Sequence, residues 1–307
     1  MMIRGLYSDF FFETMLPALR AKVFAEFKAK PRLYNKLLNV ISTQRSIEQF
    51  SQMTGVGLFA EIAEGADVGT DSMLQGFDKT FKPTKFGLGL ACSQELVEDD
   101  KIGLAGRRAV ALANSANQTI EIQGASVFNN AFATVGPDGK VLCASDHPLV
   151  KAGGVQSNIL SVAADLDVTS LELALTDWEL IKTAEGFYQT CPTPNLLVAS
   201  ANRWQAFQVV KAGQKSETAN GVVNAFDNGG ENGRAVNGPI VWAFLTDPDA
   251  WFLTAPPEQT GLVWLWRKQP FTTSDFIEKN QTGYMYMWYR ATCGFYDWRG
   301  VYGTPGA

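Results

Sequence analysis

A long helical pattern that follows a strand-like segment is the clearest feature of hydrophobic patterning in the chain. Residues 80–92 have the character of a strand, and Ser93 is a suitable cap for a helix that starts there. Apolar residues then recur every three or four positions, at Ala105, Ala109, Leu112, Ala116 and Ile120. The pattern predicts one helix over about 93–133, and its part after residue 102 would span about 45 Å.

Three glycines interrupt this pattern, at Gly103, Gly106 and Gly124. Each costs up to about 1 kcal/mol relative to alanine inside a helix. We therefore expect a bend or a break near these positions.

The first 76 residues change character at about residue 50. Residues 14–50 have a helical pattern, which Pro31 should break or restart, with a second helical piece from Leu33 to Ile41. The apolar face of the first piece consists of Leu16, Leu19, Val23 and Phe27. Residues 51–76 are punctuated by glycine and hold few large apolar residues after Ile62. They predict a long excursion, folded as a hairpin, with little core of its own.

The second half of the chain alternates short helical and strand-like patterns. Gly136 to Gly139 predict a turn, and Tyr284, Tyr286 and Trp288 should share one face of paired strands near the C-terminus. The other expected elements are a helix over 170–183, a strand over 196–199, a helix from Asn202 to Lys211, a Gly- and Asn-rich loop over 213–238, and strands over 240–245, 251–253 and 262–266. The expected fold class is α+β.

Charge is unevenly distributed along the 307 residues, whose formal net charge is −5. Residues 1–50 carry a net charge of +4 and the remainder −9. A basic arm on an acidic body could bind nucleic acid. It could also dock on an acidic body, its own or a neighbour's. The second interpretation is favoured because the basic residues are interleaved with Leu, Phe and Tyr, which are usually buried.

Candidate catalytic and metal-binding residues are few. The four cysteines, Cys92, Cys143, Cys191 and Cys293, are widely spaced, so neither a zinc site nor a disulfide framework is expected, and a reducing compartment fits them. The single histidine, His147, could act as a base beside Asp146, but a structural role is favoured because adjacent residues of an extended chain point to opposite sides. We predict no catalytic, cofactor-binding or metal-binding residues, and no cofactor.

Three other motifs have weak or structural explanations. Gly213 to Ser216 lacks the second glycine of a phosphate-binding loop. The acidic run Glu98–Asp100 suits the first turns of a helix through the helix dipole. The C-terminal aromatic cluster could stack nucleic-acid bases, but it lacks interleaved lysines, and a packed strand is the better explanation. No apolar run is long enough to span a bilayer, and no signal peptide is evident.

The order of these elements resembles the major capsid proteins of tailed bacteriophages, with the fold of the Hong Kong 97 phage capsid and Mu-type head proteins as relatives. The segments that carry the resemblance are Leu16–Leu19 with Phe24 and Phe27, Ser42–Phe50, Gly87–Asp100, Asp138–Gly139 and Ser145–Pro148. The resemblance covers nearly the whole chain.

The resemblance implies a division of the chain into structural regions. Residues 1–54 would form an N-terminal arm, 55–90 an extended E-loop hairpin, 91–189 a peripheral domain with a spine helix at about 93–133, 190–257 an axial domain, and 258–307 a return to the peripheral sheet. The E-loop would lie on a neighbouring subunit. The residues expected to contact that subunit are Lys79, Phe81, Lys82, Lys85 and Phe86. Deleting residues 60–85 should then leave a folded body that forms no closed shells.

The implied function is structural. The chain would assemble with itself into hexamers and pentamers of an icosahedral shell around double-stranded DNA, without sequence-specific binding and without a membrane. Scaffold, portal and decoration proteins would be its other partners, and assembly would take place in the bacterial host cytoplasm before the protein resides in the virion capsid. Two alternatives stay open: an encapsulin-like nanocompartment shell, and a soluble α+β hydrolase, although the sequence shows no convergent polar site that a hydrolase would need.

Overall fold

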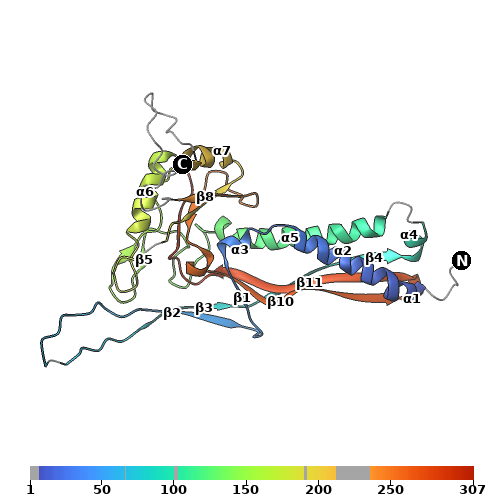
Figure 1. Ribbon diagram of the computed structural model, residues 1–307, viewed down its shortest axis with the longest axis horizontal. Helices are drawn as coiled ribbons and strands as arrows, with labels where there is room; N and C mark the ends of the chain where they lie inside the picture. Colours follow the sequence, from blue (N-terminus) through green and yellow to red (C-terminus); the bar gives the residue numbers. More distant parts are fainter. Residues whose placement is uncertain (1–6, 66, 100–102, 190–191, 212–235) are drawn as a thin grey trace.

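Two four-stranded sheets organise the chain in the computed structural model, which describes residues 7–65, 67–99, 103–189, 192–211 and 236–307 (Figure 1). A long sheet and its helices form an extended arm, and the second sheet forms a compact lobe at one end of that arm. The architecture is mixed α+β, as the sequence predicts. The Gly- and Asn-rich segment 213–238 lies largely outside the described residues.

The long sheet has the strand order β1-β10-β11-β4. Its strands are β1 (Asn39–Ser42), β10 (Leu262–Ile277), β11 (Thr282–Phe295) and β4 (Thr84–Ser93). β1 runs parallel to β10, and the other pairs are antiparallel. Along β11, Met285 and Met287 are buried, while Tyr286 between them is exposed. The predicted placement of the aromatic residues of this strand on one face is therefore confirmed.

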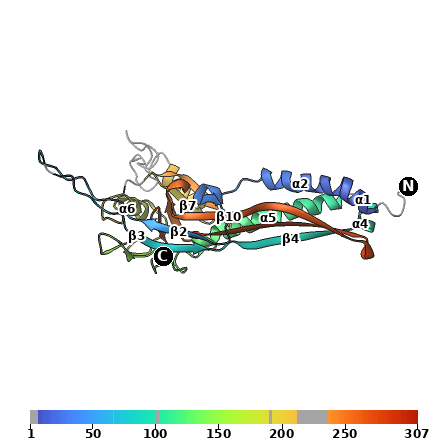
Figure 2. The same ribbon diagram turned by 90° about the horizontal axis from the view of Figure 1, so that it is seen from below.

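Two helices, α2 (Leu16–Ala29) and α5 (Leu104–Asn129), cover one face of the long sheet (Figure 2). The predicted apolar stripe is buried in α2, and in α5 it is buried apart from Ala116, which is half-buried. In α5 the stripe is rich in small residues, with Ala109 and Ala113 fully buried. These small side chains let α5 pack closely against α2 and the sheet. With 26 residues, α5 is about 39 Å long and lies along the sheet.

The prediction of one continuous helix over 93–133 is wrong. A short helix, α4 (Gln94–Glu98), follows β4, and Ser93 Oγ accepts a hydrogen bond from Leu96 N at 3.3 Å, so Ser93 caps only this helix. Gly103 has a left-handed backbone with φ of +68°. This conformation is not helical, so α5 begins only at Leu104. The expected break therefore occurs at the first of the three glycines.

The N-terminal helical pattern is also shorter than predicted. The described part of the chain starts with α1 (Tyr7–Phe10) and a π-helical turn (Phe11–Met15) that lead into α2. Between residues 31 and 50 only α3 (Tyr34–Leu37) is helical. Residues 39–41, expected to be helical, belong to β1, because pairing with β10 supplies hydrogen bonds that a short isolated helix would lack.

The second sheet has the order β12-β9-β7-β8, and β7 and β8 run parallel. Its strands are β12 (Val301–Thr304), β9 (Trp251–Thr254), β7 (Asn195–Ala199) and β8 (Asn237–Trp242). The helices of this lobe are α6 (Val168–Glu179) and α7 (Arg203–Lys211), and its smaller strands are β5 (His147–Pro148) and β6 (Val155–Gln156). The 3-10 turn Pro257–Gln259 lies between β9 and β10, and the 3-10 turn Glu278–Asn280 joins β10 to β11 in the long sheet. The predicted helix 170–183 is thus shifted, and it starts at the capping residue Asp167.

A buried carboxylate ties the N-terminal segment, α5 and the second sheet together. Glu121 Oε1 accepts a hydrogen bond from Leu33 N at 2.9 Å, and Glu121 Oε2 accepts one from Trp242 Nε1 at 2.8 Å. Burial raises the pKa of Glu121, while these hydrogen bonds oppose the rise. The carboxylate therefore satisfies two donors from segments distant in sequence.

We expect Glu121→Ala to lower the free energy of unfolding of the unassembled subunit by about 3 kcal/mol, because two buried donors lose their acceptor. Glu121→Gln is the matched control, since its amide oxygen can still accept one of the two hydrogen bonds. Denaturant unfolding measures both values. Equal losses for the two variants would contradict this role.

Candidate inter-subunit surfaces

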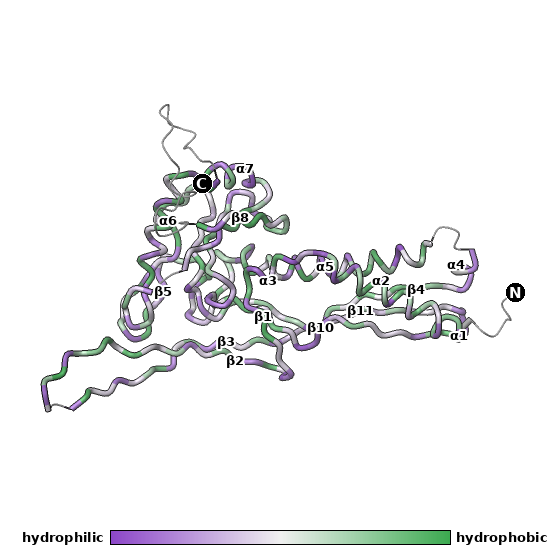
Figure 3. Tube along the Cα trace, in the orientation of Figure 1, coloured by the Kyte–Doolittle hydropathy of each residue, from purple (hydrophilic) through white to green (hydrophobic). Residues whose placement is uncertain are grey.

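A projecting loop, residues 54–74, extends from the body between β2 (Glu48–Met53) and β3 (Gln75–Phe81) (Figure 1). β2 and β3 pair as an antiparallel hairpin, so the predicted hairpin is confirmed. Apolar and hydrophilic stretches alternate along the loop (Figure 3). Its exposed apolar residues are Val56, Leu58, Phe59, Ile62, Val68, Met73 and Leu74. Phe59 is fully exposed, which is unusual for a large aromatic side chain in an isolated subunit.

The base of the projecting loop is fixed by backbone and side-chain hydrogen bonds. Thr54 is buried and donates its N–H to Leu74 O at 2.9 Å, and its hydroxyl accepts from Leu74 N at 2.8 Å. Slightly further out, Gly57 N donates to Asp71 Oδ2 at 2.7 Å. The two ends of the projecting loop are therefore hydrogen-bonded to each other where the loop leaves the body.

Two charged residues of the body hold the same base. Lys151 Nζ lies 2.6 Å from Asp71 Oδ2, and Glu185 accepts a hydrogen bond from Gly55 N. The Lys151 ammonium, with the amides of Gly57 and Ser72, lowers the pKa of Asp71 to about 2. This ion pair is therefore lost only as the pH falls below about 3.8 toward 2. The ion pair between Asp71 and Lys151 is therefore formed at neutral pH.

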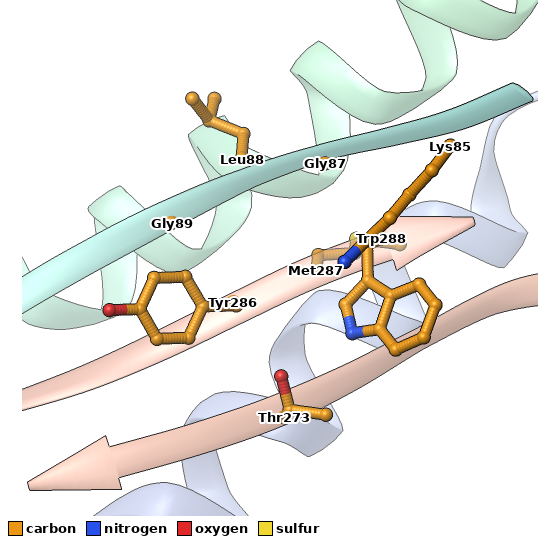
Figure 4. Close-up of a pocket in the computed structure, with 8 residues that line it drawn as sticks. All are labelled: Lys85, Gly87, Leu88, Gly89, Thr273, Tyr286, Met287 and Trp288. Atoms are coloured by element: carbon orange, nitrogen blue, oxygen red, sulfur yellow. The ribbon is translucent and has the colours of Figure 1, made fainter. Parts of the chain in front are cut away.

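The second surface is the open face of the long sheet, opposite α2 and α5. Cross-strand pairing places side chains from β4, β11 and β10 together on this face, because directly opposed residues share a face. These residues are Lys85, Gly87, Gly89, Lys268, Phe271, Thr273, Asp275, Tyr284, Tyr286, Trp288 and Arg290. In Figure 4 the side chains of Lys85, Tyr286, Trp288 and Thr273 stand on the side of the strands away from the helices.

Three basic side chains surround one aromatic ring on the open face. Lys85 Nζ lies 4.4 Å, Lys268 Nζ 5.2 Å and Arg290 Cζ 5.7 Å from the centre of the Trp288 ring. Phe271 packs against the same ring, with centroids 3.7 Å apart. Cations near a ring face are attracted to it. The Trp288 ring therefore stabilises a cluster of three positively charged side chains on a chain whose net charge is negative.

Two glycines create a hollow in this face. A Cβ atom at Gly87 would lie 2.8 Å from Trp288 Cβ, and one at Gly89 would lie 2.5 Å from the Tyr286 ring. Glycine therefore lets the two aromatic side chains lie against the neighbouring strand. The resulting hollow has a volume of about 620 Å³ and is also lined by Lys85 and Thr273. The open face can thus receive side chains of a partner.

The five residues predicted to contact a neighbour lie in different environments. Lys85 belongs to the open face, and Lys82 is exposed. Lys79 Nζ lies 3.5 Å from Val135 O, and Phe86 stacks on Tyr289 on the helix-covered side. For Phe81 the expectation needs correction. Its side chain is only 4% exposed and packs with Val263 and Leu265 in the subunit's own core, so it offers no surface to a neighbour.

The candidate catalytic residues have structural roles. His147 is fully buried, and its carboxylate partner is Asp138 rather than Asp146, which pairs with Lys140. The preferred interpretation of a structural histidine is confirmed. Within the described ranges, no group of three or more His, Cys, Asp or Glu side chains could hold a metal ion, and no helix is long and apolar enough to cross a membrane.

A known protein family matches most of the chain. The family model described as phage capsid protein matches residues 77–304. No curated protein matches the sequence.

Several solved structures share the fold. The capsid protein of cyanophage P-SCSP1u has a TM-score of 0.61 at 10% identity, over 91% of this chain and 89% of that chain. The mature capsid of bacteriophage PhiM1 has a TM-score of 0.59 at 12% identity, over 90% and 87%. The virus-like particle from Pyrococcus furiosus has a TM-score of 0.56 at 9% identity, over 94% and 98%. These identities are low, so the likeness concerns the fold alone.

Proposed function

The chain belongs to the phage capsid protein family, and we propose that its copies build the icosahedral head shell of a tailed bacteriophage, as hexamers and pentamers around packaged double-stranded DNA. Its role is structural. Assembly would take place in the host cytoplasm with the help of scaffold and portal proteins, and decoration proteins could bind the finished shell. The family match favours this function over an encapsulin-like compartment or a soluble hydrolase.

Within this function the structural regions have proposed roles. The N-terminal arm is residues 1–54, and the E-loop, 55–90, includes most of the projecting loop. The spine helix is α5 in a peripheral domain of residues 91–189. Residues 190–257 form the axial domain around hexamer and pentamer centres, and 258–307 return to the long sheet. The length of α5 and of the β10–β11 pair supports this division.

The observation that carries the proposal is the projecting loop itself. Seven exposed apolar side chains lie on this loop, and its ion pair with Lys151 and its hydrogen bond with Glu185 join it to its own subunit near its base. Burying one large apolar side chain contributes about 1.5–3 kcal/mol. Such a segment is costly in an isolated subunit and favourable in an assembly, where a neighbouring copy can cover it.

The open face of the long sheet is the proposed receiving surface. The projecting loop carries Glu61, Glu64, Asp67 and Asp71 and no basic residue. The open face carries three basic side chains, four aromatic rings and one acid, Asp275. Charge and apolar character are therefore complementary. In Figure 1 the loop points away from β10 and β11 of its own subunit, so the contact would form between copies.

Negative-stain microscopy of the purified protein tests the proposed function. We expect closed shells or rings of subunits. Protein that stays uniformly monomeric under all assembly conditions would contradict it, and shells filled with protein cargo in the native source would favour the nanocompartment.

A further inference from the structure

The only histidine of the chain lies in a closed hydrogen-bonded network that the shell function does not require. His147 has no exposed surface, and the side chain of its partner Asp138 is 3% exposed. His147 Nδ1 lies 2.6 Å from Asp138 Oδ2, and His147 Nε2 lies 3.1 Å from Asn158 Oδ1. Trp298 stacks on the imidazole, with centroids 4.4 Å apart and planes 13° apart. Both ring nitrogens therefore face an oxygen atom.

The orientation of the Asn158 amide is determined by three backbone groups. Its Nδ2 donates to Leu142 O at 2.8 Å and to Val301 O at 3.0 Å, and its Oδ1 accepts from Ala144 N at 2.8 Å. Flipping the amide would place its oxygen against two carbonyl oxygens and its NH₂ against an N–H. The flip is therefore excluded by hydrogen-bond chemistry, and it is the amide oxygen that faces His147.

An amide oxygen can only accept a hydrogen bond, so His147 Nε2 must carry a proton. On the other side of the ring, Asp138 also accepts from Lys140 N, through Oδ1 at 3.1 Å. One proton is shared between Asp138 Oδ2 and His147 Nδ1. It belongs on the nitrogen, because histidine is the stronger base and a carboxylate–imidazolium pair forms the stronger hydrogen bond.

The charges around the pair do not displace this proton. Asp146 is paired with Lys140, and Arg299 lies 3.1 Å from Asp297. Burial raises the pKa of Asp297, Arg299 opposes the rise, and the charge of Asp138 adds to it. Asp146 and Asp297 are therefore each paired with a cation, and Asp138 is the carboxylate that contacts the ring.

We infer that His147 is a buried imidazolium and that its proton locks the junction between the two sheets. The Asp138 end of the network lies in the turn after α5, which packs on the end of β11, where a Cβ at Gly136 would meet the Phe295 ring at 2.4 Å. The Asn158 end binds β12, because Gly303 N donates to Asn158 O at 3.1 Å. Removing the proton would leave two acceptors facing each other, either at Nε2 or at Nδ1.

Magic-angle-spinning NMR of sedimented protein labelled with ¹⁵N-histidine tests the inference, and the single histidine makes the assignment unambiguous. At pH 8 we expect both ring nitrogens of folded wild-type protein to carry protons. A spectrum with only one protonated ring nitrogen would overturn the inference.

Two variants test whether Asp138, and not another nearby acid, keeps the proton on His147. Asp138→Asn should yield a neutral ring at pH 8, whereas Asp146→Asn, which alters the half-exposed acid paired with Lys140, should keep the imidazolium. Loss of the imidazolium in Asp146→Asn to the same extent would overturn the assignment to Asp138. If Asp138→Asn does not fold, the wild-type spectrum alone decides.

Discussion

Replacing residues 58–70 by an Asn-Gly turn is expected to leave a folded subunit that no longer forms closed shells. Gly57 and Asp71 are already joined by a hydrogen bond, so a short turn can connect them. The base of the loop and its ion pair with Lys151 are retained. The shortened loop lacks four exposed apolar side chains, Leu58, Phe59, Ile62 and Val68, each of which would contribute about 1.5 kcal/mol or more when buried at an interface.

Thermal unfolding and negative-stain microscopy measure the two parts of this prediction. As a control, Val162→Ser removes an apolar side chain that is 75% exposed elsewhere on the subunit and should leave assembly unchanged. Wild-type yields of shells from the shortened chain would refute the role of the loop. The broader deletion of residues 60–85 is not suitable, because it removes buried Phe81 and the start of β4.

Reversing charge on the open face should also abolish assembly. In Lys85→Glu/Lys268→Glu, two of the three cations beside Trp288 become acidic, and they would face the acids of a neighbour's projecting loop. Like charges at a contact are repulsive, and close pairs at interfaces have coupling energies of about 1.5 kcal/mol or more. Both lysines are exposed, so the subunit itself should fold normally.

A charge swap makes this prediction specific to the two surfaces. Adding Glu61→Lys/Glu64→Lys to the reversed face should restore shells at low salt, whereas the loop substitutions alone should not assemble well. Lys36→Glu, which reverses an exposed lysine on α3, is the matched control and should assemble normally. Assembly of the reversed face without the compensating change would exclude the open face as the receiving surface.

The periodicity of apolar residues correctly predicted those helices and strands whose conformation depends mainly on residues nearby in the sequence. The apolar stripe of α5, the hairpin around the projecting loop and the alternation along β11 each follow from a period of 3.6 or 2 residues. The errors lie where distant contacts outweigh local preference. Residues 39–41 form a strand because β10, more than 200 residues away, pairs with them. The helix starts at Leu104 because Gly103 adopts a left-handed conformation, which periodicity alone does not reveal.

The site was less predictable than the fold. Lys85 could be named from its place beside the E-loop, but its partners Lys268 and Trp288 come from strands far away in sequence. The C-terminal aromatic cluster has no interleaved lysines in the sequence, and only cross-strand register brings Lys85 and Lys268 to it. The useful sequence signals were the aromatic alternation over 284–288 and the paired glycines Gly87 and Gly89, which together indicate an open, hollowed strand face.

The most direct test of the account is a cryo-electron microscopy reconstruction of the assembled shell. We expect the projecting loop of one subunit to lie across the open face of another, with Glu61 or Glu64 near Lys85 and Lys268, and Phe59 buried against Tyr286 or Trp288. A shell in which the loop contacts no neighbour, or in which the open face is bare, would contradict the central claim.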